Sequence, residues 1–252
     1  MWSRKDLKTR GKNLVYGNYW YMVLVSFIML FLGGAGSGSS SSSNSARNSA
    51  SGDSSLSSID WAMLATIIGI VIVVMIVAIV IGSLIKIFLC DPLLVGCQRF
   101  ILNAREGKRQ FSDVASIFND NYMNVVKIMF FRYLKTFLWS LLFIIPGIIK
   151  SYEYRMIPYI LSENPGIDKD RAFELTKAMT NGEKWNIFVY DLSFILWSFA
   201  TLFTCGLAGI FWVNPYINAT NAELYMELRE QAMRSNYTNE SELYGYHYKP
   251  MM

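Results

Sequence analysis

The chain has 252 residues, of which 53% are hydrophobic and 15% are aromatic, and its formal net charge is +4. An ordinary soluble domain does not need an apolar run such as Trp61 to Leu89, whose only charged residue is Lys86. Runs of 18 or more residues with so few charges are typical of membrane spans, and several occur here. The predicted class is therefore an all-α, polytopic transmembrane helical bundle.

Cysteine and histidine are too few and too scattered for a metal or redox centre. The chain has three cysteines and one histidine, and Cys90 and Cys97 lie two helical turns apart, too far for a disulfide. The HExxH, GxSxG and P-loop patterns are absent from the sequence. We therefore expect no metal, no cofactor, no catalytic residue and no enzymatic activity.

Residues 1–18 form a basic amphipathic segment just before the first apolar run. A basic cluster beside a first span marks the cytoplasmic side, so we expect this segment to lie inside the cell. The same charges favour contact with anionic lipid headgroups over contact with nucleic acid. The cations are Arg4, Lys5, Lys8, Arg10 and Lys12.

Six apolar segments predict six passes within a membrane domain covering residues 19–229. Their approximate bounds are 19–35, 61–89, 122–145, 147–163, 185–203 and 207–225. Residues 36–58 are a low-complexity Ser-rich loop, which we expect to be disordered on the outer side. Residues 230–252 are predicted to be a flexible cytoplasmic tail, and six passes place both termini inside.

Local signals predict where several helices begin and end. Asp91-Pro92 is expected to end the second span, because proline breaks helices. A short helix is expected to begin at 111–113. Asp168 has the chemistry of an N-cap for a helix that runs to Thr180, and Asn181-Gly182 is a typical stop signal.

The segment from Leu141 to Leu161 contains a helix-breaking pair, Pro146 and Gly147. We interpret this pair as the hinge between the third and fourth passes. If the pair only kinks one helix, the number of passes falls to five.

Charged side chains follow this hinge at Lys150, Glu153 and Arg155. Lys150 and Glu153 are neighbours on a helix because they are three residues apart. The group lines a cavity for a charged headgroup or peptide, or alternatively forms a simple ion pair at the interface.

Asp191 lies two turns into the fifth predicted span. An acid at that depth is expected to face the bundle, toward Arg132 or Lys135. Its role is either a structural ion pair between two helices or contact with a proton or substrate.

The sixth predicted span carries Asn214, Asn218, Asn221 and Tyr225 on one helical face. Hydrogen bonds between helices explain such a stripe, and so does a hydrated cavity.

Several short segments, spread in order over nearly the whole chain, resemble an uncharacterised bacterial integral-membrane family, domain of unknown function 975 (DUF975). They are GNYW (17–20), VG and RF (95–96 and 99–100), IPGIIKSYEYRMIPYIL (145–161), AM (178–179), GEKW (182–185), LSFILW (192–197) and WVNPY (212–216). The Ser-rich loop and Asp191 depart from the family pattern. The resemblance implies a multi-pass protein of the bacterial cytoplasmic membrane and supplies no activity.

Two functional hypotheses follow from these patterns. The first is a non-enzymatic membrane protein that binds or moves an amphipathic molecule, either a lipid or a hydrophobic peptide. The second is a non-catalytic scaffold or accessory subunit, with a membrane-protein partner or a second copy of the chain.

Overall fold

The computed structural model describes residues 3–17, 19–31, 61–107, 110–119, 121–195 and 207–245, together with positions 197, 199, 201 and 204. Every regular element in these ranges is a helix, so the all-α prediction is confirmed. The Ser-rich segment 36–58 lies outside the described residues, as does the end of the tail.

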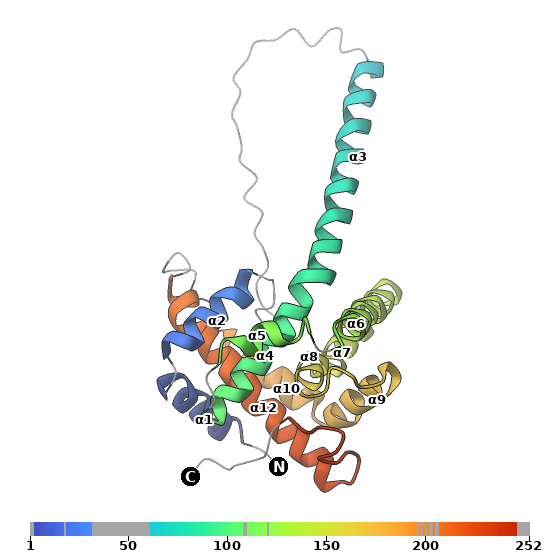
Figure 1. Ribbon diagram of the computed structural model, residues 1–252. Helices are drawn as coiled ribbons and strands as arrows, with labels where there is room; N and C mark the ends of the chain where they lie inside the picture. Colours follow the sequence, from blue (N-terminus) through green and yellow to red (C-terminus); the bar gives the residue numbers. More distant parts are fainter. Residues whose placement is uncertain are drawn as a thin grey trace.

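The helices form a compact group from which one long helix projects (Figure 1). The elements are α1 (Arg4–Gly17), α2 (Tyr19–Phe31), α3 (Trp61–Ile85), η1 (Lys86–Cys90), α4 (Asp91–Arg105), α5 (Ser112–Ser116), α6 (Tyr122–Leu142), α7 (Ile144–Glu153), α8 (Ile157–Glu163), α9 (Lys169–Thr180), α10 (Lys184–Leu192), η2 (Gly209–Val213) and α12 (Asn214–Arg234). The projecting helix is α3, and the others pack around α4, α8 and α12.

The projecting helix does not end at Asp91-Pro92, which corrects the sequence prediction. The chain passes through one π-helical turn, η1, in which the Asp91 amide donates to the Lys86 carbonyl, and continues as α4. Pro92 has no amide to donate to the Phe88 carbonyl, and the Tyr122 hydroxyl donates to that carbonyl instead. The π turn and the side-chain donor together let the helix continue past the proline.

The same arrangement occurs a second time, at the start of α12. The π turn η2 precedes Asn214-Pro215, and the Asn214 amide donates to the Gly209 carbonyl. The two sites share the sequence pattern Ile-Phe-x-x-Asp/Asn-Pro, at 87–92 and 210–215. In both places proline occupies the first turn of the following helix, where its missing amide is tolerated.

Helices α6 and α7 form an antiparallel hairpin whose reversal lies at Phe143. Phe143 has an extended backbone (φ −155°, ψ 140°), whereas Pro146 and Gly147 lie within the first turns of α7. The hinge is therefore three residues earlier than predicted. Gly147 serves close packing, because a Cβ there would lie 2.7 Å from the Ser140 Cα atom on α6.

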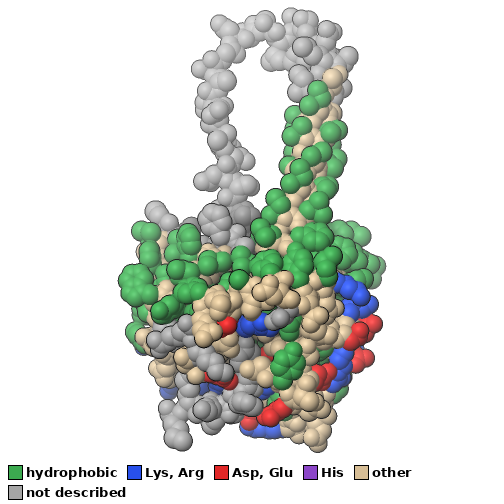
Figure 2. All heavy atoms as spheres, in the orientation of Figure 1, with side chains coloured by type: hydrophobic (Ala, Val, Ile, Leu, Met, Phe, Trp, Pro, Cys, Tyr) green, Lys and Arg blue, Asp and Glu red, His purple; other side chains and the backbone are tan. Residues whose placement is uncertain are grey.

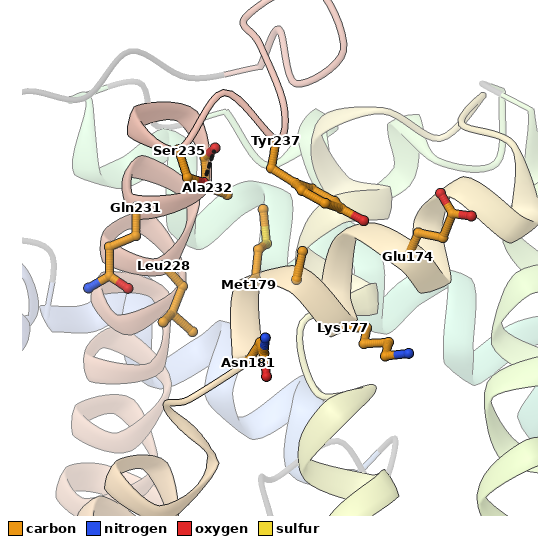
Figure 3. A pocket seen from close by; sticks show the side chains of 10 residues that line it. Glu174, Lys177, Met179, Asn181, Leu228, Gln231, Ala232, Ser235 and Tyr237 are labelled. Atoms are coloured by element: carbon orange, nitrogen blue, oxygen red, sulfur yellow. Dashed lines mark hydrogen bonds between the residues drawn. The ribbon is translucent and has the colours of Figure 1, made fainter.

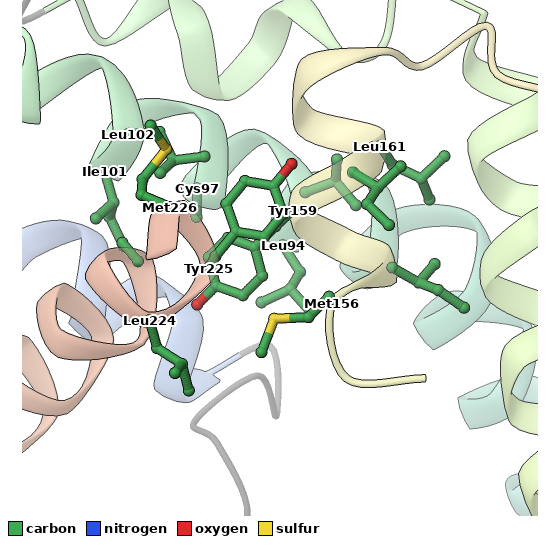
Figure 4. Close-up of a cluster of buried hydrophobic side chains, with 14 of the residues drawn as sticks. Leu94, Cys97, Ile101, Leu102, Met156, Tyr159, Leu161, Leu224, Tyr225 and Met226 are labelled. Carbon is green, nitrogen blue, oxygen red and sulfur yellow. The ribbon is translucent and has the colours of Figure 1, made fainter. Parts of the chain in front are cut away.

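The core lies where α4, α8 and α12 cross. Figure 4 shows Tyr159 of α8 over Tyr225 of α12, and the two rings stack with centroids 5.1 Å apart. Cys97 and Ile101 of α4 complete this part of the core and are fully buried. All residues of α8 are buried, so the second half of the fourth predicted pass is an interior helix of the compact group.

Helix α9 follows its sequence signals closely. The Asp168 side chain accepts hydrogen bonds from the amides of Asp170 (2.9 Å) and Arg171 (3.3 Å), as an N-cap does. Gly182, just beyond the helix, has a positive φ of 78°. That conformation suits glycine and ends the helix.

The described part of the tail lies against the body. Helix α12 runs on to Arg234, beyond the predicted start of the tail. After it, Leu243 is fully buried, and its carbonyl accepts from Arg229 Nη2 at 2.8 Å. Arg171 of α9 donates to Glu242 at 2.6 Å, so residues 235–245 are held by both α9 and α12.

Apolar and charged side chains occupy different levels of the surface. In Figure 2 hydrophobic side chains cover α3 and form a band across the adjoining part of the body, with charged side chains below that band. Within the described residues, one helix, Ile68–Arg105, is long and apolar enough to cross a membrane. Its most apolar 18-residue window has no share buried inside the protein.

Candidate functional site

Glu153, at the end of α7, is shared by two lysines. Its Oε1 lies 2.7 Å from Lys150 Nζ, and its Oε2 lies 2.5 Å from Lys184 Nζ at the start of α10. Glu153 is buried, whereas the two lysine side chains remain 23% and 31% exposed. The cluster therefore carries one excess positive charge on its accessible side.

Aromatic rings surround this lysine–glutamate cluster. Lys150 Nζ lies 5.5 Å from the centroid of the Trp139 ring on α6 and 5.7 Å from that of Tyr154, distances at which a cation is attracted to a ring face. Trp185, beside Lys184, is exposed and packs on Phe188. A small cationic group with apolar and aromatic neighbours suits an anionic group carried by an apolar molecule.

Arg155 belongs to a second, separate cluster. The helix breaks between α7 and α8, and Arg155 Nη1 lies 2.6 Å from Asp191 Oδ2 of α10. Arg155 Nη2 donates to Asn221 Oδ1 of α12 at 2.9 Å, and Tyr190 donates to the same oxygen at 3.1 Å. The prediction that Asp191 faces Arg132 or Lys135 is therefore wrong, because the break in the chain brings Arg155 to it.

The two cations expected to pair with Asp191 contact aromatic rings instead. Lys135 Nζ is 3.7 Å from the centroid of the Phe173 ring on α9, and Arg132 lies over the ring of Tyr133 at 5.4 Å. Both cations use aromatic faces on or beside α6, and neither reaches across to α10.

The polar stripe of α12 bonds to several other helices. Asn218 donates to Ser26 of α2 at 3.0 Å, and Tyr225 donates to Glu163 of α8 at 2.6 Å. Asn214 is half-buried at the beginning of α12. These hydrogen bonds join α12 to α2 and α8.

Two buried ion pairs on α12 were missed by sequence reasoning. Arg229 pairs with Glu163 at 3.0 Å, and Glu223 pairs with Arg105 of α4 at 2.7 Å. The signal was present, since Glu223 and Arg229 lie near the Asn218 and Tyr225 stripe. Helical spacing alone does not indicate which distant residue completes each pair.

The basic N-terminal segment is only partly free. Arg10 is an ion-pair partner of Glu227 at 3.5 Å and lies 3.9 Å from Glu223, so it joins α1 to α12. Lys8 lies over the Phe194 ring, at 4.6 Å. Arg4, Lys5 and Lys12 remain exposed and could meet an anionic surface.

Asp91, at the π turn η1, is a buried acid that sequence reasoning did not select. Its Oδ1 accepts from the Tyr133 hydroxyl at 3.1 Å and lies 3.9 Å from Lys86 Nζ. Its repeated counterpart is Asn214, which has a neutral side chain of the same shape.

One cavity is lined by none of the predicted site residues. It has a volume of about 730 Å³ and lies between α9, the end of α12 and Tyr237 (Figure 3). The charged side chains that line it, Glu174 and Lys177, are exposed. A second cavity of about 500 Å³ lies beside Arg99, Asn103 and Glu163.

Metal binding and thiol chemistry find no support in the described residues. Among them there is no group of three or more His, Cys, Asp or Glu side chains that could hold a metal ion. Burial raises the pKa of Cys97 to about 12, which keeps this thiol protonated and unreactive near neutral pH.

Over the described residues, the fold and these clusters define an all-helical protein with one helix of membrane-spanning length and a body joined by buried polar contacts. The family described as Protein of unknown function (DUF975) has a model that matches residues 111–232. The resemblance to that family is therefore confirmed over just under half of the chain, a stretch that contains Lys150, Glu153, Arg155, Asp191 and the α12 stripe. No curated protein and no solved structure matches the chain.

Proposed function

We propose that this protein resides in the bacterial cytoplasmic membrane, with both termini inside, and that it binds or moves an amphipathic molecule. The support for membrane residence is α3, whose 25 residues extend about 37 Å at 1.5 Å per residue. That length exceeds the roughly 30 Å hydrocarbon core of a bilayer. The exposed basic residues of α1 favour the cytoplasmic side for the N-terminus.

A multi-pass arrangement built from three pairs of segments is part of the proposal, with each pair entering the membrane and returning to the same side. The pairs are α2 with α3, α6 with α7, and α10 with the segment that leads into α12. The antiparallel hairpin of α6 and α7 favours paired segments over the alternative with five passes, because Phe143 reverses the chain and does not merely kink it. Each pair begins and ends on one side, so both termini share that side.

The observation that carries the functional proposal is the lysine–glutamate cluster of Lys150, Glu153 and Lys184. One carboxylate cannot neutralise two ammonium groups, and both lysines remain accessible. A phosphate or carboxylate could approach them without breaking the contacts to Glu153. The neighbouring Trp139 and Trp185 suit the acyl part of the same molecule.

An anionic lipid therefore fits the site better than a hydrophobic peptide does. The excess charge is positive, and lipid phosphates are abundant where a protein emerges from the bilayer. No reaction is part of the proposal, and neither a cofactor nor nucleic acid has a role in it.

The Arg155–Asp191–Asn221 cluster has a different role in this proposal. Its two charges cancel, and its oxygen atoms already accept from Arg155 and Tyr190. A cluster saturated in this way holds α7, α10 and α12 together. This observation favours the second candidate function, a scaffold or accessory subunit whose polar residues serve only to hold helices.

The test is native mass spectrometry of the protein extracted into nanodiscs with its own lipid. We expect one or a few anionic lipids to remain bound to the wild type and to be lost from Lys150→Gln/Lys184→Gln. Lys177→Gln is the matched control, because it removes an exposed cation of α9 that lines the cavity beside Tyr237.

The outcome decides between the two candidate functions. Retention of the lipid in the double variant would overturn the site. A protein partner or second copy in fixed ratio, with no lipid lost on substitution, would favour the scaffold.

A further inference from the structure

The reversal between α6 and α7 is apolar throughout. From Leu141 to Ile149 the chain has no polar side chain. The five residues from Leu141 to Ile145 are between 64% and 76% exposed. A loop that crossed the bilayer and emerged into water would be expected to carry polar residues at its turn, and this one does not.

The backbone of this reversal also needs few partners from outside. The Phe143 amide donates to the Trp139 carbonyl at 3.1 Å, and the Gly147 amide donates to the Phe143 carbonyl at 3.1 Å. Pro146 has no amide hydrogen at all. The backbone amides at three of the five positions from 143 to 147 therefore require no hydrogen bond from solvent. This property suits a hydrocarbon surrounding.

Helix α9 fixes the level that water reaches on this hairpin. Phe173 of α9 packs on Tyr154, with ring centroids 5.0 Å apart, and Thr176 donates to the Glu153 carbonyl at 2.8 Å. Lys135 of α6 lies over the same Phe173 ring. The opposite face of α9 exposes Glu174 and Lys177, so α9 lies in water and contacts the hairpin at Lys135 and Glu153.

The hairpin extends only a short distance beyond that level. Eight residues separate Lys135 from Phe143, which corresponds to about 12 Å of helix. On the returning limb, Lys150 lies six residues beyond Ile144, which corresponds to about 9 Å. The hydrocarbon core of a bilayer is about 30 Å thick, so the tip reaches less than half of it.

We propose that the α6–α7 hairpin enters one leaflet from the side of α9 and returns to that side, with Phe143 among the acyl chains. This inference rests on the proposed membrane residence and replaces two of the six predicted passes by a single dip. Both termini keep the same side, because a dip, like a pair of passes, begins and ends on one face.

Charge and packing at the base of the hairpin agree with this placement. Lys127 is exposed on α6, and Lys135 and Lys150 are partly exposed nearer the tip. Lys135 and Lys150 would lie level with the phosphates of the leaflet, with their stems packed on the apolar surface, and Lys127 would lie farther out toward water. Gly147 lets the two limbs meet closely against Ser140, which keeps the inserted wedge narrow.

The test is site-directed labelling of the full chain in sealed membrane vesicles. Single cysteines are introduced at Phe143, Thr66 and Lys127 in a chain with Cys90→Ser, Cys97→Ala and Cys205→Ser. Thr66 lies about 30 Å along the helix from Lys86, so it marks the far surface. Lys127 marks the surface on the side of α9.

A membrane-impermeant maleimide should label Thr66→Cys from one side and Lys127→Cys from the other. We expect Phe143→Cys to react at least about tenfold more slowly from either side, because the hydrocarbon contains no water. A fluorophore attached there should be quenched most strongly by lipids brominated midway along their acyl chains. If the cysteine-free chain misfolds, the same cysteines are introduced one at a time into the wild-type chain. The labelling of each variant is then compared with that of the unmodified wild type.

Different failures would identify different errors. Labelling of Phe143→Cys from the same side as Thr66→Cys would show that the hairpin crosses, and labelling from the side of Lys127→Cys would show that it lies outside the bilayer. If the protein stays in the membrane after an alkaline carbonate wash, either result overturns the proposed dip and leaves membrane residence standing. Loss of the protein in that wash would overturn membrane residence and the dip together.

Discussion

Arg229 and Glu163 form an ion pair with little access to water. Arg229 Nε lies 3.0 Å from Glu163 Oε1 and 3.1 Å from Oε2, and the two side chains are 2% and 0% exposed. Tyr225 donates to the same carboxylate, and Arg229 also holds the Leu243 carbonyl of the docked tail. The pair therefore joins α8, α12 and residues 235–245.

Removing only the arginine should be strongly destabilising. Arg229→Met leaves the Glu163 charge buried with Tyr225 as its neutral donor, and breaking such a pair typically costs about 3–5 kcal/mol. Glu163→Leu/Arg229→Met removes both charges and keeps similar volumes, which is often neutral or stabilising. We expect the double variant to recover most of the loss, less about 1–3 kcal/mol for the unpartnered Tyr225 hydroxyl.

Thermal unfolding in mild detergent measures this difference. For a chain of this size, 1 kcal/mol corresponds to roughly 2–4 °C, so Arg229→Met should lower the melting temperature by about 6–20 °C. Arg234→Met is the control, since Arg234 pairs with Glu230 one turn away on α12 and its own side chain is 69% exposed. A loss below about 1 kcal/mol for Arg229→Met would refute the burial argument, as would a double variant no more stable than the single one.

Two further predictions concern the docked tail and the packing of α4. Hydrogen bonds from Arg171 hold the pKa of Glu242 below its ordinary value of 4.5, so their contribution is complete above that pH and is lost as the pH falls below it. The protection of the amides in residues 235–245, relative to their intrinsic exchange rates, should therefore fall in acid for the wild type, and Arg171→Gln should show low protection at every pH; equal acid sensitivity of the protection in both would contradict this. Gly96→Ala should destabilise the protein by about 1–3 kcal/mol, because its Cβ would lie 2.0 Å from the Val114 carbonyl oxygen. Gly82→Ala, with nothing within 4 Å, should be tolerated, and equal melting temperatures for the two variants would contradict the close contact between α4 and α5.

Features set by neighbours along the chain could be predicted from the sequence. Asp168 and Gly182 bound α9 as expected, since an N-cap and a left-handed stop depend only on residues within one turn. Lys150 and Glu153 pair because three residues bring two side chains together on any helix.

Contacts between helices could not be predicted in this way. Arg155 was assigned to the same cluster as Glu153, but the break after α7 turns it toward Asp191. Lys184, the second partner of Glu153, lies 31 residues away along the chain. No periodicity within one helix indicates which distant residue will complete an ion pair.

Proline caused the two errors about helix ends. The sequence predicts that Pro92 ends a helix, but a π turn carries the helix past it. The sequence also predicts a hinge at Pro146, but the reversal lies at Phe143 and Pro146 lies in the first turn of α7. Proline is tolerated in the first turn of a helix, so its position relative to the helix start decides its effect.

The two Ile-Phe-x-x-Asp/Asn-Pro sites reveal a common boundary in the architecture. Before each site the helix is apolar, as in α3 and the residues that lead to η2. After each site the helix is buried in the body and carries polar partners, such as Arg105 on α4 and Glu223 on α12, which pair with each other. The ion pair between Arg105 and Glu223 joins α4, which follows η1, to α12, which follows η2. The two π turns therefore lead into the same layer of packed helices, although they are far apart in the sequence. In the proposed orientation this layer starts where the hydrocarbon ends, which is also the level of Lys135 and Lys150 at the base of the α6–α7 hairpin.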